Sequence, residues 1–234
     1  MKFLKFDEID STNNYLKENI SNFSNFDIVS AKNQSLGRGR RGNKWVSSEG
    51  MALFSFLLKP DKKLEIKNYT KLPLIAGIAT LKALEKIEEN KYQFKWTNDI
   101  YLNNKKLCGI LVEKVENDFI IGIGVNVNNK IPKEIEEIAT SLNGKYDIDQ
   151  VILKIVEEFF FYYDRFIQGQ WIEILSEINS YNLLKNKKIR LSAGDKKYDG
   201  LALDILEDGS LEVKIGEEFK NFNAGEISIE KGFI

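Results

Sequence analysis

The sequence predicts an α+β protein with two units, a larger one over residues 1–184 and a small all-β one over residues 185–234. Three observations support this prediction. Strand-like segments separated by short turns follow one another between residues 93 and 127, as in a hairpin meander. Two amphipathic helices follow within residues 147–182. The chain then changes to short strands between glycine turns, and this last unit is too small for a large core of its own. We therefore expect it to pack on the first unit.

The first part of the chain is expected to alternate strands and helices. Strands are predicted where β-prone apolar residues run together, at residues 3–6, 27–31 and 51–58. A helix ending near residue 22 begins after Asp10–Asn13, whose polar side chains can cap it. Residues 32–50 are rich in glycine, arginine and serine and are expected to form a long loop, which in a compact protein is typically functional or disordered. Residues 71–89 have helical periodicity, with an apolar face formed by Leu74, Ile78, Leu81, Leu84 and Ile87.

The meander and the helices after it complete the larger unit. Its strands are predicted at residues 93–96, 99–102, 106–115 and 119–127. Asn103-Asn104 and residues 116–118 are turn-like links between them. The two helices are predicted at residues 147–167 and 171–182.

Composition excludes several classes of protein. The chain has 234 residues, is 43% hydrophobic and 29% charged, and is therefore typical of a globular protein with a real core. Its 34 lysines and arginines nearly cancel 35 aspartates and glutamates, so there is no overall basic field to attract nucleic acid. It contains no histidine, which argues against Ser-His-Asp and Cys-His hydrolases and against the usual zinc site. The single cysteine, Cys108, cannot form an intramolecular disulfide and fits a reducing compartment.

The sequence gives no sign of export or membrane insertion. Charged residues interrupt the N-terminal segment, so it does not resemble a signal peptide. The longest apolar run, residues 72–81, is too short to cross a bilayer and contains Pro73 and Thr80. A cytoplasmic protein is expected.

The most informative motif is Gly37-Arg38-Gly39-Arg40-Arg41-Gly42, followed by Trp45. Glycines permit close backbone approach and arginines offer guanidinium forks to carboxylate or phosphate oxygens. The motif differs from a Walker-type phosphate loop, because Asn43-Lys44 replaces the required lysine and hydroxyl residue. Taken alone, it fits a solvated basic loop or a nucleic-acid arm as well as an anion site.

A second motif, Lys95-Trp96-Thr97-Asn98-Asp99, precedes Lys106. It can be a strand end and a turn, or it can place Asn98 and Asp99 beside a nucleotide or its magnesium ion, which prefers oxygen ligands. Lys106 can be a solvated lysine at the mouth of a strand, or a mobile point charge that neutralises a phosphate and a carboxylate together.

Small and hydroxyl residues supply a third group of candidates. Gly109, Gly122 and Gly124 lie in apolar strands, where missing side chains leave room for a ligand. Ser11 and Thr12 are helix caps by default but could also bind a small polar ligand. Cys108 is expected to be a buried apolar residue rather than a nucleophile.

The order and spacing of these motifs resemble biotin protein ligases over nearly the whole chain. The resemblance rests on Asp10–Asn13, Gln34 with the glycine-arginine motif and Trp45, KWTND at residues 95–99, residues 105–113, Gly122–Asn128, and the C-terminal segments 208–211 and 224–227. One departure is Thr97, where the family usually has proline. That difference changes local stiffness and not the ligand-binding side chains.

The resemblance implies a mixed β-sheet flanked by helices, similar to class II aminoacyl-tRNA synthetases, with a small β-barrel-like C-terminal domain. It implies that ATP and magnesium convert biotin to biotinyl-5′-adenylate, and that a lysine of a biotin carboxyl carrier protein then takes the biotinyl group. Because the catalytic region begins almost at Met1, the chain is similar to the monofunctional class that lacks a DNA-binding domain. No DNA or membrane partner is expected, and the protein is expected to be a monomer or a weak homodimer.

The resemblance also implies residue roles. Catalytic roles fall to Lys106, Arg40 and Asp99, with Asp99 also a possible magnesium ligand. Biotin is expected to contact Ser11, Thr12, Asn13, Gln34, Gly37, Arg38, Lys106, Gly109, Leu111, Gly122 and Gly124. The nucleotide is expected to contact Arg38, Arg40, Arg41, Trp45, Asn98, Lys106 and Asn126.

This chemistry agrees with the residues themselves. A carboxylate is already ionised at pH 7, so the first step needs no base, which fits a chain without histidine. Two alternatives remain at this level. A lipoate or octanoate ligase of the same fold would need a longer apolar slot without ureido-binding groups, and a nucleic-acid-binding module would bind with strong salt dependence.

Overall fold

The computed structural model describes residues 1–39, 42, 45–60, 65–142 and 144–229. Arg40 and Arg41, both predicted for the site, lie outside the described residues.

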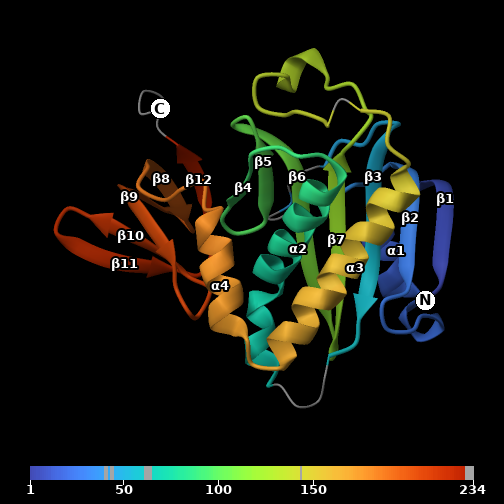
Figure 1. Cartoon of the computed structure of the whole chain (residues 1–234), viewed down its shortest axis with the longest axis horizontal. Coiled ribbons are helices and arrows are strands. Elements are labelled where there is room, and N and C mark those ends of the chain that lie inside the picture. Colours follow the sequence, from blue (N-terminus) through green and yellow to red (C-terminus); the bar gives the residue numbers. More distant parts are fainter. Residues whose placement is uncertain (40–41, 43–44, 61–64, 143, 230–234) are drawn as a thin grey trace.

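A seven-stranded mixed sheet forms the centre of the protein (Figure 1). Its strands are β1 (Phe3–Ile9), β2 (Ile28–Gln34), β3 (Met51–Leu58), β4 (Tyr92–Lys95), β5 (Asp99–Leu102), β6 (Lys105–Val115) and β7 (Asp118–Asn126). Their order across the sheet is β1-β2-β3-β7-β6-β5-β4. The β1–β2 pair is parallel and the other pairs are antiparallel. The mixed sheet and the predicted meander are confirmed, because β4 to β7 follow one another along the chain and pair as hairpins.

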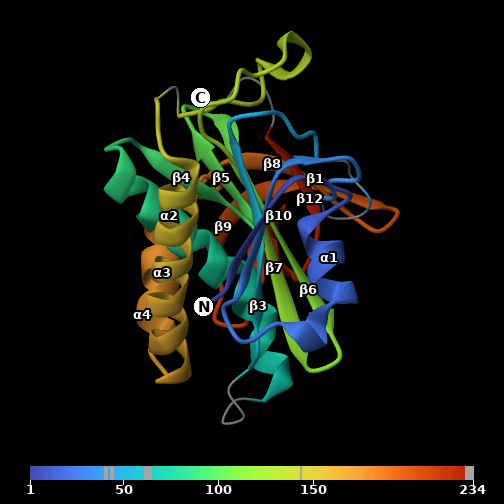
Figure 2. The ribbon, with the colours of Figure 1, turned by 90° about the vertical axis from the view of Figure 1, so that its right-hand side faces the viewer.

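Helices cover both faces of this sheet unequally (Figure 2). The long helices α2 (Leu72–Ile87) and α3 (Ile148–Ile167) pack on one face, while the short helix α1 (Thr12–Glu18) packs on the other. Helix α4 (Trp171–Ser180) follows α3 and packs beside α2. Short 3-10 helices occur at Ile20–Asn22, Ile66–Lys71 and Lys133–Ile135. No helix among the described residues is both long and apolar enough to span a membrane.

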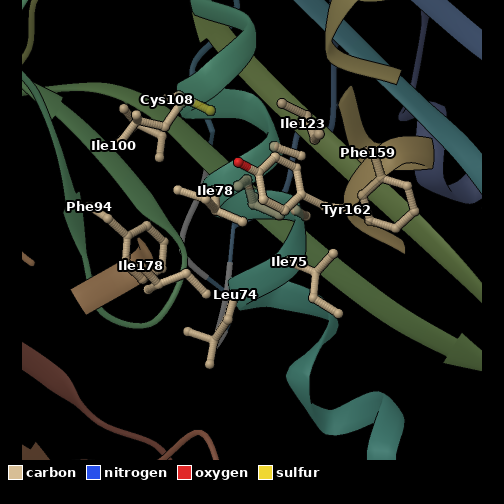
Figure 3. Close-up of a cluster of buried hydrophobic side chains, with 14 of the residues drawn as sticks. Leu74, Ile75, Ile78, Phe94, Ile100, Cys108, Ile123, Phe159, Tyr162 and Ile178 are labelled. Atoms are coloured by element: carbon tan, nitrogen blue, oxygen red, sulfur yellow. The ribbon is translucent and has the colours of Figure 1, made fainter. Parts of the chain in front are cut away.

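The main hydrophobic core lies between the sheet and the long helices (Figure 3). Helix α2 is apolar nearly all round and is buried from Leu72 to Leu84, apart from Pro73 and Lys82. It contributes Leu74, Ile75 and Ile78 to the cluster in the close-up. Gly77 allows α2 to approach the sheet closely, because a Cβ built there would lie 2.3 Å from Cε2 of Phe94. The core therefore fixes the sheet against α2, while the opposite face carries the short helix α1.

A five-stranded antiparallel sheet follows α4, in the order β11-β10-β9-β8-β12. Its strands are β8 (Lys188–Ala193), β9 (Lys196–Ile205), β10 (Leu211–Ile215), β11 (Glu218–Phe222) and β12 (Glu226–Ile229). The expected barrel-like form is wrong in this detail, since the described strands β11 and β12 end an open sheet and do not pair with each other. Its apolar residues, including Ile189, Leu191 and Leu211, belong to the same continuous core as α2.

Candidate active site

The site begins as a row of residues across the face of the large sheet that α1 covers. The strand registers align Leu53, Gly124, Gly109, Asp99 and Lys95 from β3 across to β4. Side chains alternate between the faces of a strand. The neighbours Phe54, Ile123, Ile110 and Ile100 belong to the core on the α2 side. The row therefore faces away from α2, and its two glycines leave a flat patch of backbone.

A cavity of about 60 Å³ lies over this patch. It brings together most of the residues predicted for the site, although they come from four separate parts of the sequence. Its lining includes Ser11, Thr12, Asn13, Gln34, Arg38, Trp45, Asn98, Asp99, Lys106, Gly109, Leu111, Gly122 and Gly124.

Among the predicted site residues that the structure describes, two do not line this cavity. Gly37 lies behind Trp45, accepts a hydrogen bond from the Trp45 N–H at 2.9 Å, and has no room for a Cβ, which would be 2.6 Å from the Trp45 carbonyl oxygen. Asn126 ends β7, and its Oδ1 accepts a hydrogen bond from Asn129 Nδ2 at 3.1 Å.

The indole of Trp45 lies directly on the glycine patch. A Cβ at Gly124 would be 2.6 Å from the indole Nε1, and a Cβ at Gly109 would be 2.9 Å from the indole Cζ3. Both glycines are therefore needed to accommodate this side chain. The buried Nε1 has no hydrogen-bond acceptor among the described residues, and Lys106 Nζ lies 5.3 Å from the ring centroid. The indole is thus held by stacking and by a cation.

A buried hydrogen-bond network forms the polar part of the cavity. Gln34 Oε1 accepts bonds from the Thr12 N–H at 2.8 Å and from its hydroxyl at 3.2 Å. The Thr12 hydroxyl also lies 2.6 Å from Ser55 Oγ, which donates to Asn13 Oδ1. Ser11 precedes α1 without making a capping bond through its side chain. Its hydroxyl is therefore not used as the helix cap that the sequence suggested as the default.

Glu113 extends the network toward the glycine-arginine loop. It accepts a hydrogen bond from Asn13 Nδ2 at 2.7 Å and pairs with Arg38, whose Nη2 lies 3.4 Å from both carboxylate oxygens. Arg38 also donates to Asn14 Oδ1. Gly122 is essential here, because a Cβ would lie 2.2 Å from Asn13 Oδ1.

Sequence reasoning assigned no role to Ser55 or Glu113. Both gave a usable signal, since Ser55 is the only polar residue in Met51–Leu58 and Glu113 follows the apolar run Leu107–Val112. A polar residue inside an apolar strand needs a hydrogen-bond partner when it is buried.

Positive charge gathers on the β5–β6 side of the cavity. Lys106 Nζ lies 2.8 Å from Asp99 Oδ1, an oxygen that is buried and accepts no hydrogen bond from any described residue. The contact is thus an ion pair without hydrogen-bond alignment, which an incoming anion can replace. Lys95 lies beside Asp99 in the register and its Nζ is 3.3 Å from the Tyr101 hydroxyl. Burial lowers the pKa of Lys95 and raises that of Tyr101 to about 12.

Asn98 supports the turn that carries Asp99. Its side-chain Nδ2 donates to the Ile110 backbone carbonyl at 2.6 Å, and its backbone carbonyl accepts from the Ile110 N–H at 3.0 Å. It lines the cavity while bracing β5 against β6.

The described residues of the cavity could supply a magnesium ion with only one protein ligand. Within the described part of the chain, no cluster of three acidic, histidine or cysteine side chains forms a protein-made metal site. Asp99 offers a single carboxylate in the cavity. Mg²⁺ commonly takes one or two carboxylates and completes its shell with phosphate and water oxygens. Asp99 is compatible with that mode of binding.

Comparison with known proteins gives consistent results. A family model described as the biotin/lipoate A/B protein ligase family matches residues 5–128. The chain is 33% identical over 215 residues to the bifunctional ligase/repressor BirA of Bacillus subtilis, covering 86% of this chain and 66% of that protein. It is 30% identical over 238 residues to BirA of Escherichia coli, covering 94% of this chain and 72% of that protein.

The fold has a close structural match in a biotin protein ligase from Aquifex aeolicus solved in complex with biotin and ATP. The TM-score is 0.88 at 35% sequence identity, and the match covers 98% of both chains.

Proposed function

The chain belongs to the biotin/lipoate A/B protein ligase family, and from this premise we propose that it activates biotin with ATP and transfers the biotinyl group to a lysine of a carrier protein. The observation that carries the proposal is the joining of a buried polar network and the ion-paired Lys106 in one cavity over two glycines. The first feature suits a ureido ring, and the second suits a carboxylate meeting a phosphate.

In the proposed first step, a carboxylate oxygen of biotin attacks the α-phosphorus of ATP. A new O–P bond forms, the bond to the bridging oxygen breaks, and pyrophosphate leaves with that electron pair. No proton moves, because the carboxylate is already ionised. The barrier comes from repulsion between two anions, which fixed positive charge offsets. Lys106 would exchange Asp99 for these anions, with Arg38 and Arg40 assisting it.

In the proposed second step, the amine of the acceptor lysine attacks the acyl carbon and AMP leaves. The amine has a reference pKa near 10.4 and must lose a proton first. Asp99 is the candidate acceptor, because the movement of Lys106 toward the ligands would free its buried oxygen.

The polar network favours biotin over lipoate or octanoate. Ser11, Thr12, Asn13 and Gln34 would hydrogen-bond the ureido ring, while Leu111 and Gly122 would border its apolar remainder. Gly109 and Gly124 would also border it once the Trp45 indole, which covers both glycines, moves aside. A lipoyl or octanoyl group has no ureido nitrogen or oxygen, so it could not hydrogen-bond to these side chains and would gain no affinity from them.

The nucleotide would lie on the Trp45 side, with Asn98, Arg41 and Asn126 as further candidate contacts. Magnesium, when bound, would neutralise phosphate charge, and Asp99 is its candidate protein ligand. The named ligases of this family include biotin–[acetyl-CoA-carboxylase] ligase, so the acceptor we propose is a biotin carboxyl carrier protein. We further propose that the protein acts in the cytoplasm as a monomer or weak homodimer, and its net charge of −1 supports no DNA partner.

Calorimetric titration tests this proposal. Biotin should bind in the absence of nucleotide, and a subsequent ATP titration with magnesium should release pyrophosphate. Lipoate and octanoate serve as matched acids without a ureido ring. Binding of either acid with an affinity equal to that of biotin would refute the assignment.

A further inference from the structure

We propose that Glu113 is a positioning residue that joins the biotin-facing Asn13 to Arg38 of the glycine-arginine loop, so that the buried polar network and the loop are held as one unit. The inference rests on the proposed function, because it assigns Glu113 a part in biotin retention.

The orientation of the Asn13 amide is set by its two hydrogen-bond partners. Its side chain is buried, with only 5% of the residue exposed. Its Oδ1 accepts from Ser55 Oγ and its Nδ2 donates to Glu113 Oε2 at 2.7 Å. Since one end of the amide faces a donor and the other a carboxylate, only one orientation satisfies both ends. Glu113 therefore fixes which atoms Asn13 presents to the cavity.

The Arg38 guanidinium is held by Asn14 and Glu113. This side chain is 42% exposed and belongs to a loop, so it has little packing to hold it. Its Nη2 contacts Asn14 Oδ1 and lies 3.4 Å from both Glu113 oxygens. Asn14 belongs to α1 and Glu113 to β6, so the guanidinium is held between a helix and the sheet.

Asn13 and Arg38 both contact the carboxylate of Glu113. Glu113 is 25% exposed and belongs to β6, where it pairs with Ile120 of the neighbouring strand β7. A rigid strand residue that binds both Asn13 and Arg38 couples the polar network to the loop. A group ordered in advance costs a ligand less conformational entropy on binding.

The same geometry permits an opposite role, and the two roles predict opposite results. If Glu113 were only a resting counter-ion of Arg38, it would compete with the biotin carboxylate, and its removal would tighten binding. If it positions Asn13 and Arg38, its removal weakens binding.

The experiment compares Glu113→Gln with wild-type protein by measuring biotin affinity and dissociation rate. Glutamine keeps an acceptor for Asn13 but loses the charge that holds Arg38. We expect biotin to bind about fivefold more weakly, with most of the change in the dissociation rate. Glu113→Ala removes both contacts and should weaken binding further. Glu212→Gln changes a half-buried strand glutamate of the other sheet and serves as the matched control.

A double-mutant cycle with Arg38→Gln separates positioning from a general loss of structure. If Glu113 acts through Arg38, Glu113→Gln should have little further effect on biotin affinity in the Arg38→Gln background. Additive losses would overturn the proposal, and so would equal or tighter biotin binding by Glu113→Gln. Failure of wild-type protein to bind biotin would instead refute the proposed function, and this inference with it.

Discussion

Lys106 carries the charge on which the proposed first step depends. Its side chain is 32% exposed, and its ammonium is paired with Asp99 at 2.8 Å, inside the cavity. We predict that Lys106→Ala reduces biotinyl-adenylate formation by roughly a hundredfold or more, since one preorganised charge can contribute ~3 kcal/mol to a transition state. Single-turnover pyrophosphate release measures this rate.

Lys105 provides a matched control for that variant. Its ammonium donates to the Glu136 carbonyl at 2.6 Å and does not line the cavity. Lys105→Ala should leave the rate close to that of wild-type protein. If Lys106→Ala releases pyrophosphate as fast as Lys105→Ala does, the role of Lys106 is wrong.

Burial determines the pKa of the Cys108 thiol (Figure 3). The side chain is fully buried in the core between the sheet and α2, and burial raises the pKa of its thiol well above the usual range. A raised pKa means that the reactive thiolate remains scarce as the pH rises through 8 and 9. We predict that a thiol reagent modifies the native protein orders of magnitude more slowly than the urea-unfolded protein. Equal rates at pH 8 would show that the thiol is accessible.

At the scale of the elements, Gly77 determines how closely α2 approaches the sheet. Alanine is a better helix former than glycine by about 1 kcal/mol. A Cβ at this position, however, would lie 2.3 Å from Cε2 of Phe94, which is fully buried. Overpacking of a core typically costs about 1–3 kcal/mol. Gly77→Ala should therefore lower the free energy of unfolding despite the gain in helix propensity, as urea denaturation would measure.

The double variant Gly77→Ala/Phe94→Leu tests the cause of that loss. Leucine removes the ring edge that the new methyl group would meet. The two changes should be non-additive, with the double variant more stable than the sum of the single losses predicts. Strict additivity would mean that the ring does not limit the approach of α2.

Much of the element pattern could be predicted from the sequence because local periodicity determines it. The strand Met51–Leu58 agrees with its prediction to the residue, and the strands of the meander agree within one or two residues. The single turn Lys133–Ile135 was not predicted, since a short polar segment carries no periodic signal.

The candidate site was predictable only in part, for a related reason. The motifs identified most residues of the cavity lining. The polar residues Ser55 and Glu113 could be noticed inside or beside apolar strands, but they could not be matched to Asn13, because they lie 42 and 100 positions from it and approach it only in the folded sheet. The position of Trp45 over Gly109 and Gly124 was missed likewise, since stacking across a sheet leaves no local pattern.

For the whole molecule, two tryptophans of the larger unit, one after β4 and one in α4, link it to the C-terminal sheet. Trp96 Nε1 donates to the Gly209 carbonyl at 3.0 Å, and Trp171 Nε1 donates to the Glu207 carbonyl at 2.7 Å. Both acceptors belong to the turn between β9 and β10, and the hydrophobic core continues from one sheet to the other. The two units predicted for residues 1–184 and 185–234 should therefore unfold together.

We predict one urea transition, with the same midpoint by circular dichroism and by tryptophan fluorescence. Trp171→Phe replaces the indole by a smaller phenyl ring and removes its hydrogen bond, so it should lower the free energy of unfolding in that single transition by at least about 1 kcal/mol. A separate early transition of the C-terminal sheet would contradict this account.

The central claim is that this cavity joins biotin to ATP, and isotope exchange between pyrophosphate and ATP tests it most directly. The first step is reversible without any carrier protein, so the assay isolates the proposed chemistry. We predict exchange that requires biotin and is absent with lipoate or octanoate in its place. Exchange supported by lipoate or octanoate, or no exchange with biotin, would contradict the claim.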